Sequence, residues 1–131
     1  MLQLHHIGVL AKDMEEAIES YKGIFSASSV SEIIYISSQE VNVCFVKIQS
    51  EIFIELVQPT SEASPVQKLI KKGFTYYHNG YTVQHFDREI ELLEKKNYKL
   101  LSVFNSEAFN NRRCAFLMSP VMHLVELIET A

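Results

Sequence analysis

The sequence predicts an α+β fold made of two copies of one βαβββ module. Three short features of the first half recur in the second half in the same order. His6 precedes Phe45 by 39 residues, and the matching His78 precedes Phe116 by 38 residues. The third feature, an acid flanked by apolar residues, follows the matching phenylalanine by 10 residues in both halves. Helix and strand patterns also share one order, so a duplicated module explains the chain better than coincidence.

The first module is expected to span residues 1–58. Residues 2–10 alternate between apolar and polar side chains, as a half-buried strand does. Asp13 and Glu16 have capping-box spacing, which predicts that a helix begins there and continues to Tyr21. Short polar turns separate three further segments rich in β-branched residues. These predict strands over 31–37, 40–48 and 51–57.

The second module is expected to span residues 74–131 and repeats this order. A strand is predicted near 77–84, followed by a helix over 86–96 that turns apolar side chains inward. The predicted inward residues are Ile90, Leu92 and Leu93. Three more strands follow near 98–104, 113–119 and 123–129.

A linker over 59–73 is expected to join the modules within one domain, 1–131. Ser64 followed by Pro65 predicts the start of a short helix, and Gly73 predicts its end. Lys71 and Lys72 near that end are consistent with a solvated helix terminus or with contacts to the phosphates of a CoA ester.

Composition narrows the classes of partner. The net charge is −4 and the sequence contains no Lys/Arg-rich block, which argues against nucleic acid and anionic membranes. Apolar runs end well short of the ~20 residues that span a bilayer, and no signal segment is evident, so a cytoplasmic protein is expected. Cys44 and Cys114 lack CxxC spacing and are predicted to be buried, reduced thiols. Small molecules remain as partners.

Two carboxylates stand in segments that otherwise resemble core. Glu55 lies within EIFIELVQP and Glu126 within HLVELIET. Burying an ionised carboxylate costs several kcal/mol unless it is paired or binds a metal. The repeat nominates His6 and His78 as partners, one from each module, with a glycine two residues after each that leaves space beside an imidazole. Two histidines and two glutamates would then meet at the seam between the modules.

The chain resembles the vicinal oxygen chelate superfamily, which includes glyoxalase I, methylmalonyl-CoA epimerase, extradiol dioxygenases and bleomycin-resistance proteins. The resemblance rests on HHIGVLAKDMEEAIESYK, IELVQPTSEASPVQKLIKKG, YHNGYTVQHFD and NRRCAFLMSPVMHLVELIE. It implies that the two modules pair into a half-barrel. It also implies that one divalent ion (Co, Ni, Zn or Mn) binds to His6, Glu55, His78 and Glu126.

The resemblance implies a lyase or isomerase of the glyoxalase I or methylmalonyl-CoA epimerase type. In such enzymes the metal stabilises an enolate, and a carboxylate transfers the proton. Glu126 is the expected base and Glu55 its partner. Asn111 and Arg112 are expected to contact the substrate, an acyl-CoA or a thiol adduct, and the chain is expected to form a homodimer.

Other interpretations remain. The same fold sequesters small ligands without a metal in bleomycin-resistance proteins, and a purely structural protein would leave the buried glutamates unexplained. Val43 stands where epimerases can carry a further acid, so a separate acid/base is not expected. His5 is expected to face away from His6 by strand alternation, and His85 and His123 are not expected to bind metal.

Overall fold

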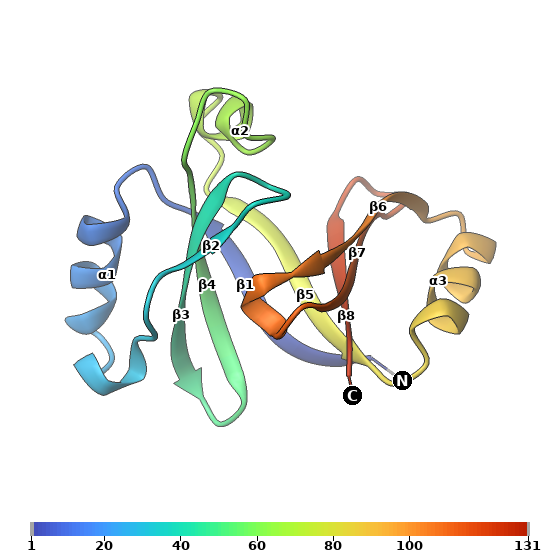
Figure 1. Cartoon of the computed structure of the whole chain (residues 1–131), viewed down its shortest axis with the longest axis horizontal. Helices are drawn as coiled ribbons and strands as arrows, with labels where there is room; N and C mark the ends of the chain where they lie inside the picture. Colours follow the sequence, from blue (N-terminus) through green and yellow to red (C-terminus); the bar gives the residue numbers. More distant parts are fainter. Residues whose placement is uncertain (1, 131) are drawn as a thin grey trace.

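A single mixed β-sheet of eight strands forms the centre of the molecule. The computed structural model describes residues 2–130. Neighbouring strands follow the order β2-β3-β4-β1-β5-β8-β7-β6, and the sheet curls into a half-barrel with two helices on its outside (Figure 1). The strands are β1 (Gln3–Leu10), β2 (Ile34–Ile36), β3 (Val41–Gln49), β4 (Ile52–Pro59), β5 (Tyr76–Val83), β6 (Lys99–Ser106), β7 (Arg112–Met118) and β8 (Leu124–Glu129).

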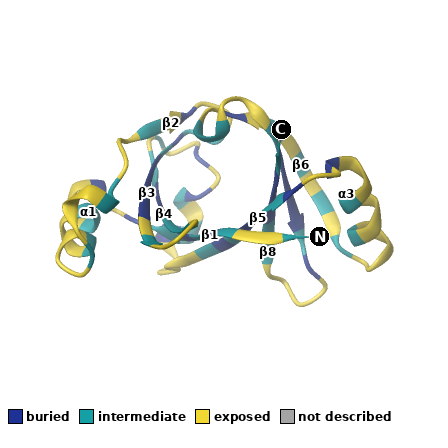
Figure 2. Cartoon of the chain, turned by 90° about the horizontal axis from the view of Figure 1, so that it is seen from below, coloured by how far each residue is buried: buried dark blue, intermediate teal, exposed yellow. Residues whose placement is uncertain are grey.

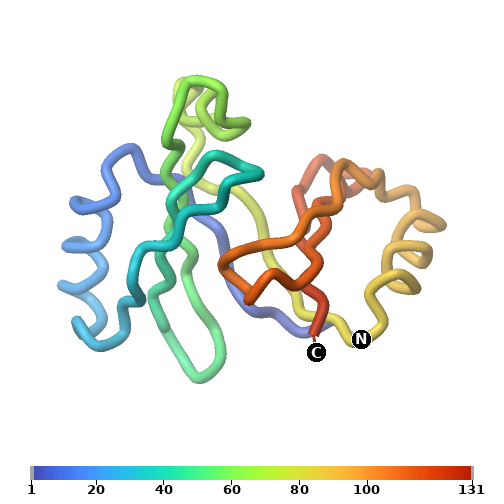
Figure 3. Tube along the Cα trace, viewed as in Figure 1, coloured from blue at the N-terminus to red at the C-terminus, as the bar shows by residue number. Residues whose placement is uncertain are grey.

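The sheet consists of two halves with the same internal order. In each half the first strand pairs in parallel with the last, as β1 does with β4 and β5 with β8. The halves join where β1 and β5 run antiparallel. The chain crosses from one half to the other through α2 (Gln67–Lys71), which lies at the top of the trace in Figure 3. The predicted fold class, two βαβββ units in a half-barrel, is confirmed.

One long helix covers the outer face of each half. In α1 (Met14–Lys22), the Asp13 side chain accepts a hydrogen bond from the backbone N–H of Glu16, as the capping pattern predicted. Met14 packs there against Cys44 and Leu56. In Figure 2 the two helices are largely exposed, whereas the strands between them carry most of the buried residues.

The second long helix, α3 (Phe86–Lys95), buries Phe86 and Ile90 against Leu117 and Leu127. Leu93 also packs against this cluster. The prediction that Leu92 points inward is wrong, because Leu92 is 40% exposed. Consecutive helical positions lie about 100° apart, so the inner face accommodates only one of these two leucines.

The inner, concave face is closed by a contact between the two halves. Glu107 begins the short 3₁₀ turn η2 (Glu107–Phe109), and its Oε2 accepts hydrogen bonds from the backbone N–H (3.1 Å) and hydroxyl (2.7 Å) of Ser37 beside β2. Phe109 packs against Phe45 of the opposite half. This β2–η2 clasp brings part of the second half over the concave face of the first.

Two local expectations differ from the structure. Strand β2 has three residues and follows a 3₁₀ turn, η1 (Ala27–Ser29), in place of a seven-residue strand. Helix α2 begins at Gln67 without a side-chain cap, because the Ser64 hydroxyl donates to the carbonyl of Gln39 instead. Gly73 follows the helix with φ +86°, as its predicted end requires. Among the described residues, no helix is long and apolar enough to span a membrane.

Candidate metal centre

Each histidine of the pair lies over a glycine of the other half. In the β1–β5 ladder, His6 is opposite Gly80 and His78 is opposite Gly8. A Cβ atom on Gly8 would lie 2.7 Å from Cε1 and 2.8 Å from Nδ1 of His78, and one on Gly80 would overlap the His6 ring. The glycine after each histidine therefore makes space for the imidazole of the other half, and any larger side chain would displace that ring.

The carboxylates come from the strands that flank this central pair. Glu55 of β4 lies beside Gly8, and Glu126 of β8 lies beside Gly80. On their other sides, Glu55 is opposite Phe45 and Glu126 is opposite Phe116. The shared spacing in the sequence thus corresponds to two equivalent rows across the sheet. One row is Phe45, Glu55, Gly8 and His78, and the other is Phe116, Glu126, Gly80 and His6.

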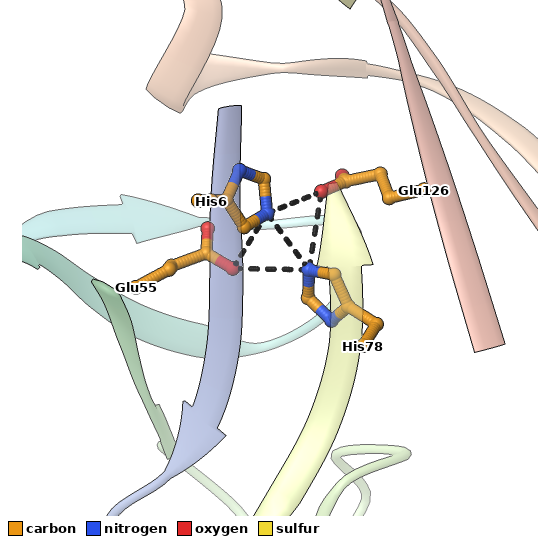
Figure 4. Close-up of side chains that lie close together, drawn as sticks. All are labelled: His6, Glu55, His78 and Glu126. Carbon is orange, nitrogen blue, oxygen red and sulfur yellow. Dashed lines mark hydrogen bonds and ion pairs between the residues drawn. The ribbon is translucent and has the colours of Figure 1, made fainter. Parts of the chain in front are cut away.

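The four side chains converge on one point (Figure 4). The two Nε2 atoms of His6 and His78 are 2.9 Å apart. Oε1 of Glu55 lies 3.4 and 3.2 Å from these two nitrogens, and Oε1 of Glu126 lies 3.1 and 3.2 Å from them. No member of the set is more than 4% exposed.

This donor set fits a divalent metal ion. Ligand atoms about 2.1 Å from one first-row ion lie roughly 3.0–3.5 Å apart in tetrahedral or octahedral geometry. Four ligand atoms, one from each side chain, lie within 4.8 Å of one another. Oε1 of Glu126 is buried without a hydrogen bond of adequate geometry, although both histidine nitrogens are near it. A cation that replaces the protons shared by such converging nitrogen and oxygen atoms would satisfy all four at once.

In the metal-free protein the same four groups form a buried ion-pair cluster. Burial alone would lower the pKa of His78, but the carboxylates of Glu126 and Glu55 outweigh burial and raise this pKa to about 9. Burial alone would raise the pKa of Glu126, but the imidazoles of His6 and His78 outweigh it and lower this pKa to about 2. Glu126 is therefore ionised at neutral pH, with a protonated His78 beside it.

His5 does not face away from His6, so this expectation from alternation is wrong. The β1–β5 register shifts between Leu4 and His6, which makes His5 the extra residue of a β-bulge. Its Nδ1 lies 2.9 Å from Nδ1 of His6, and its ring stacks on Phe53 with centroids 5.0 Å apart. Burial, together with the charge of His6, lowers the pKa of His5 to about 4. The adjacent pair of histidines in the sequence was the available signal.

The expected substrate residues lie away from the cluster. Asn111 and Arg112 are exposed, and Asn111 has φ +61° in the turn before β7. Arg113 pairs with Asp87 and with Glu129. The remaining side chains are placed as follows: His85 and His123 are exposed, Lys71 pairs with Glu62, and Cys44 and Cys114 are buried and free as predicted.

A small cavity of about 20 Å³ adjoins the four clustered side chains. This volume accommodates about one water molecule. Glu55, His78 and Glu126 line it together with apolar residues of both halves, among them Val43. Two polar residues outside the cluster also line it, Gln39 and Tyr77. Burial and the charges of Glu126 and Glu55 raise the pKa of Tyr77, so this phenol stays neutral.

Comparisons with known proteins agree with this architecture. The chain is 25% identical to the mitochondrial methylmalonyl-CoA epimerase of Dictyostelium discoideum over 131 residues, 97% of this chain and 78% of the relative. A hypothetical protein of Bacillus halodurans superposes with a TM-score of 0.81 at 25% identity, covering 99% of this chain and 95% of that one. A variant of Streptomyces coelicolor methylmalonyl-CoA epimerase, solved with 2-nitronate-propionyl-CoA, superposes with a TM-score of 0.83 at 24% identity, covering 98% and 94%.

The family assignment rests on a match that covers most of the chain. Residues 5–116 match the model of one family, and this range includes His6, Glu55 and His78 of the cluster. The paired modules and the curled eight-stranded sheet agree with the match. The chain belongs to the glyoxalase/bleomycin resistance protein/dioxygenase superfamily, also called the vicinal oxygen chelate superfamily.

Proposed function

We propose that this protein is a divalent-metal-dependent isomerase that moves a proton on the carbon next to a carbonyl or thioester. The observation that carries the proposal is the buried cluster of His6, Glu55, His78 and Glu126, whose ligand atoms lie within 4.8 Å of one another. A buried cluster of this kind is costly to maintain for structure alone. Its position beside a cavity at the junction of two modules is typical of a binding site.

The four side chains would hold the ion, which as a Lewis acid makes hydrogen on carbon beside a carbonyl more acidic. Glu126 is ionised in the metal-free protein, the form that a general base requires. Its carboxylate lines the cavity and would accept the proton from the substrate carbon. The apolar residues around the cavity limit the access of water to the reacting carbon.

Glu55, in its protonated form, would deliver a proton to the opposite face of the carbon, and Glu126 would keep the proton that it removed until both carboxyl groups exchange with solvent. Figure 4 shows Glu55 and Glu126 reaching toward the histidine pair from opposite sides, as their places in β4 and β8 require. Two carboxylates that approach from opposite sides allow removal from one face of a planar carbon and delivery to the other. Val43 lines the cavity where an additional acid would be needed, so both proton-transfer roles fall to the two clustered glutamates.

An acyl-CoA is the substrate class that we propose first. The Dictyostelium relative is a methylmalonyl-CoA epimerase, and the Streptomyces epimerase was solved with a CoA derivative. Because the cavity holds about one water molecule, an acyl group would enter it only once the β2–η2 clasp opens, and the carrier would stay outside. We further propose a homodimer in solution, which light scattering would test.

Two measurements test the function. The first is metal content per chain after dialysis against Co(II), Ni(II), Zn(II) or Mn(II), for which a ratio near one is expected. The second is exchange of the C2 hydrogen of methylmalonyl-CoA with deuterium from solvent, followed by mass spectrometry and compared with isomerisation of a hemithioacetal. Binding of one ion together with deuterium exchange into methylmalonyl-CoA supports the epimerase type. Binding of one ion with isomerisation of the hemithioacetal alone supports the glyoxalase type.

A metal-free sequestering protein is the alternative. Such a protein would show a metal ratio near zero under all these conditions. It would catalyse neither deuterium exchange into methylmalonyl-CoA nor isomerisation of a hemithioacetal. Such a result would contradict the proposed function. The buried glutamates weigh against this alternative, because a pocket that only encloses an apolar ligand does not require two carboxylates.

A further inference from the structure

The environment of His6 extends beyond the four clustered side chains. If His6 presents the lone pair of Nε2 to a metal, its proton must reside on Nδ1. A buried N–H needs an acceptor, and ligating histidines commonly donate this hydrogen to a neighbouring group. The only side-chain atom of the described residues found within hydrogen-bond distance of Nδ1 of His6 is Nδ1 of His5, at 2.9 Å.

The β-bulge is what brings these two adjacent side chains together. In a regular strand, neighbouring residues point to opposite faces, and His5 would then lie far from the Nδ1 atom of His6. The register shift between Leu4 and His6 inserts His5 as an unpaired residue and changes the direction of its side chain. Bulges of this kind are frequent beside functional sites because they redirect one side chain.

Three phenyl rings hold the imidazole of His5 in place. It stacks on Phe53, and its edge contacts Phe109 and Phe45 with centroids 5.3 and 5.9 Å away. These contacts fix the ring with its Nδ1 toward Nδ1 of His6. A ring with its proton on Nε2 can accept a hydrogen bond at Nδ1 in this position.

His78 has no such partner. Its Nδ1 is buried without a hydrogen bond among the described residues. The position before it in the repeat holds Tyr77, whose ring meets His78 edge-on with centroids 4.5 Å apart. The two halves are thus equivalent in the four clustered side chains but not in the residue that precedes each histidine.

We propose that His5 is a positioning residue that accepts the Nδ1–H of His6 and thereby holds Nε2 of His6 ready for a metal ion. This inference rests on the metal site proposed above. It makes His6 the pre-oriented histidine of the pair and assigns a purpose to the β-bulge in β1. His5 itself does not touch the ion or the substrate in this arrangement.

Two substitutions of His5 distinguish its role as a hydrogen-bond acceptor from its packing against the phenyl rings. His5→Phe keeps an aromatic ring among the three phenyl groups but removes the acceptor, whereas His5→Asn keeps an acceptor at the δ position. We expect the Kd for Co(II) to rise about 10–100-fold in His5→Phe and to stay near that of the unaltered protein in His5→Asn. His85→Phe, which removes an exposed histidine away from the cluster, is the control and should leave the Kd unchanged.

The tautomers of His5 and His6 can be measured in the unaltered protein, without any variant. Long-range ¹H–¹⁵N correlation spectra of the unaltered Zn(II)-loaded protein should show His5 with its proton on Nε2 and His6 with its proton on Nδ1. The opposite tautomer of either ring would overturn the inference. In Co(II)-loaded His5→Phe, the paramagnetically shifted Nδ1–H signal of His6 should exchange faster with solvent than in the unaltered protein.

The failures of the two proposals are distinguishable. If the unaltered protein binds Co(II) and His5→Phe binds it equally well, the positioning role is refuted while the metal site stands. Equal loss of affinity in His5→Phe and His5→Asn would also refute it, because the acceptor would then make no difference. If the unaltered protein binds no metal, both the site and the role of His5 are refuted.

Discussion

Substituting Gly8 by alanine should damage the metal centre without touching any ligand. The added Cβ would lie 2.7 Å from Cε1, 2.8 Å from Nδ1 and 3.0 Å from Nε2 of His78, whereas ordinary contact begins at 3.4 Å. The ring must therefore move by at least about 0.7 Å, and metal–ligand distances tolerate only about 0.2 Å. Because changes to the supporting residues of metal ligands already cost 10–100-fold in affinity, we expect the Kd for Co(II) to rise by at least about 100-fold.

The same overlap should also lower stability. Overpacking a filled interior costs about 1–3 kcal/mol, because the neighbours must leave their preferred positions. For a chain of this size each kcal/mol corresponds to about 4 °C in Tm. A thermal melt of the metal-free protein and a Co(II) titration followed by absorbance give the two quantities separately.

Two other glycines provide matched controls. Gly23→Ala would place its Cβ 3.4 Å from the nearest atom, a backbone oxygen of Ser20, so neither Kd nor Tm should fall. Gly73→Ala meets nothing within 4 Å but has φ +86°, so it should lose about 1 kcal/mol through backbone strain and keep its Kd. Unchanged Co(II) affinity in Gly8→Ala, or an equal loss of affinity in Gly73→Ala, would refute the reasoning.

The remaining predictions concern the ligands, pH and the clasp. His6→Ala and Glu126→Gln should each lower metal content sharply in elemental analysis, and full metal content in both would contradict the proposed ligand set. In the metal-free protein, the pKa of His78 is raised from 6.5 to about 9, so the stability it contributes is complete below pH 6.5 and is lost as the pH rises through 9. The pKa of Glu126 is lowered from 4.5 to about 2, so its contribution is complete above pH 4.5 and is lost as the pH falls toward 2. The Tm of the metal-free protein, measured in chelator, should therefore be highest between about pH 4.5 and 6.5. The other ionisable groups that face His78 and Glu126 are His6, Glu55 and Tyr77. A Tm that keeps rising above pH 7 would contradict this prediction. Glu107→Ala removes the hydrogen bonds from Ser37, so Co(II) should be released to a chelator faster. The Tm should change little because Glu107 is exposed. An unchanged release rate would show that the β2–η2 clasp does not limit access to the cavity.

Much of the fold followed from local patterns in the sequence. The duplicated spacing, the Asp13 cap and the end of α2 at Gly73 are properties of short segments, so they could be predicted. The length of β2 could not, because it depends on contacts with the distant η2 turn. The wrong placement of Leu92 has a similar cause, since the strands beneath α3 determine which of its residues face the sheet.

The candidate site was predictable to the same degree. The repeat identified the four clustered residues, because equal spacing in two modules places equivalent side chains in equivalent rows. The role of His5 was not predictable by alternation, since one inserted residue reverses the facing of a strand. Which glycine makes space for which imidazole depends on the pairing of β1 with β5, a contact between halves that no local pattern encodes.

The reciprocal contact of each histidine with a glycine of the other half has an evolutionary consequence. A gene duplication usually frees one copy to diverge, but here a larger residue at Gly80 is admissible only once His6 has become smaller, and the same holds for Gly8 and His78. Relatives that have abandoned metal chemistry are therefore expected to change these positions as pairs drawn from opposite halves. Such paired replacement in a sequence would mark a lineage that kept the fold and gave up the ion.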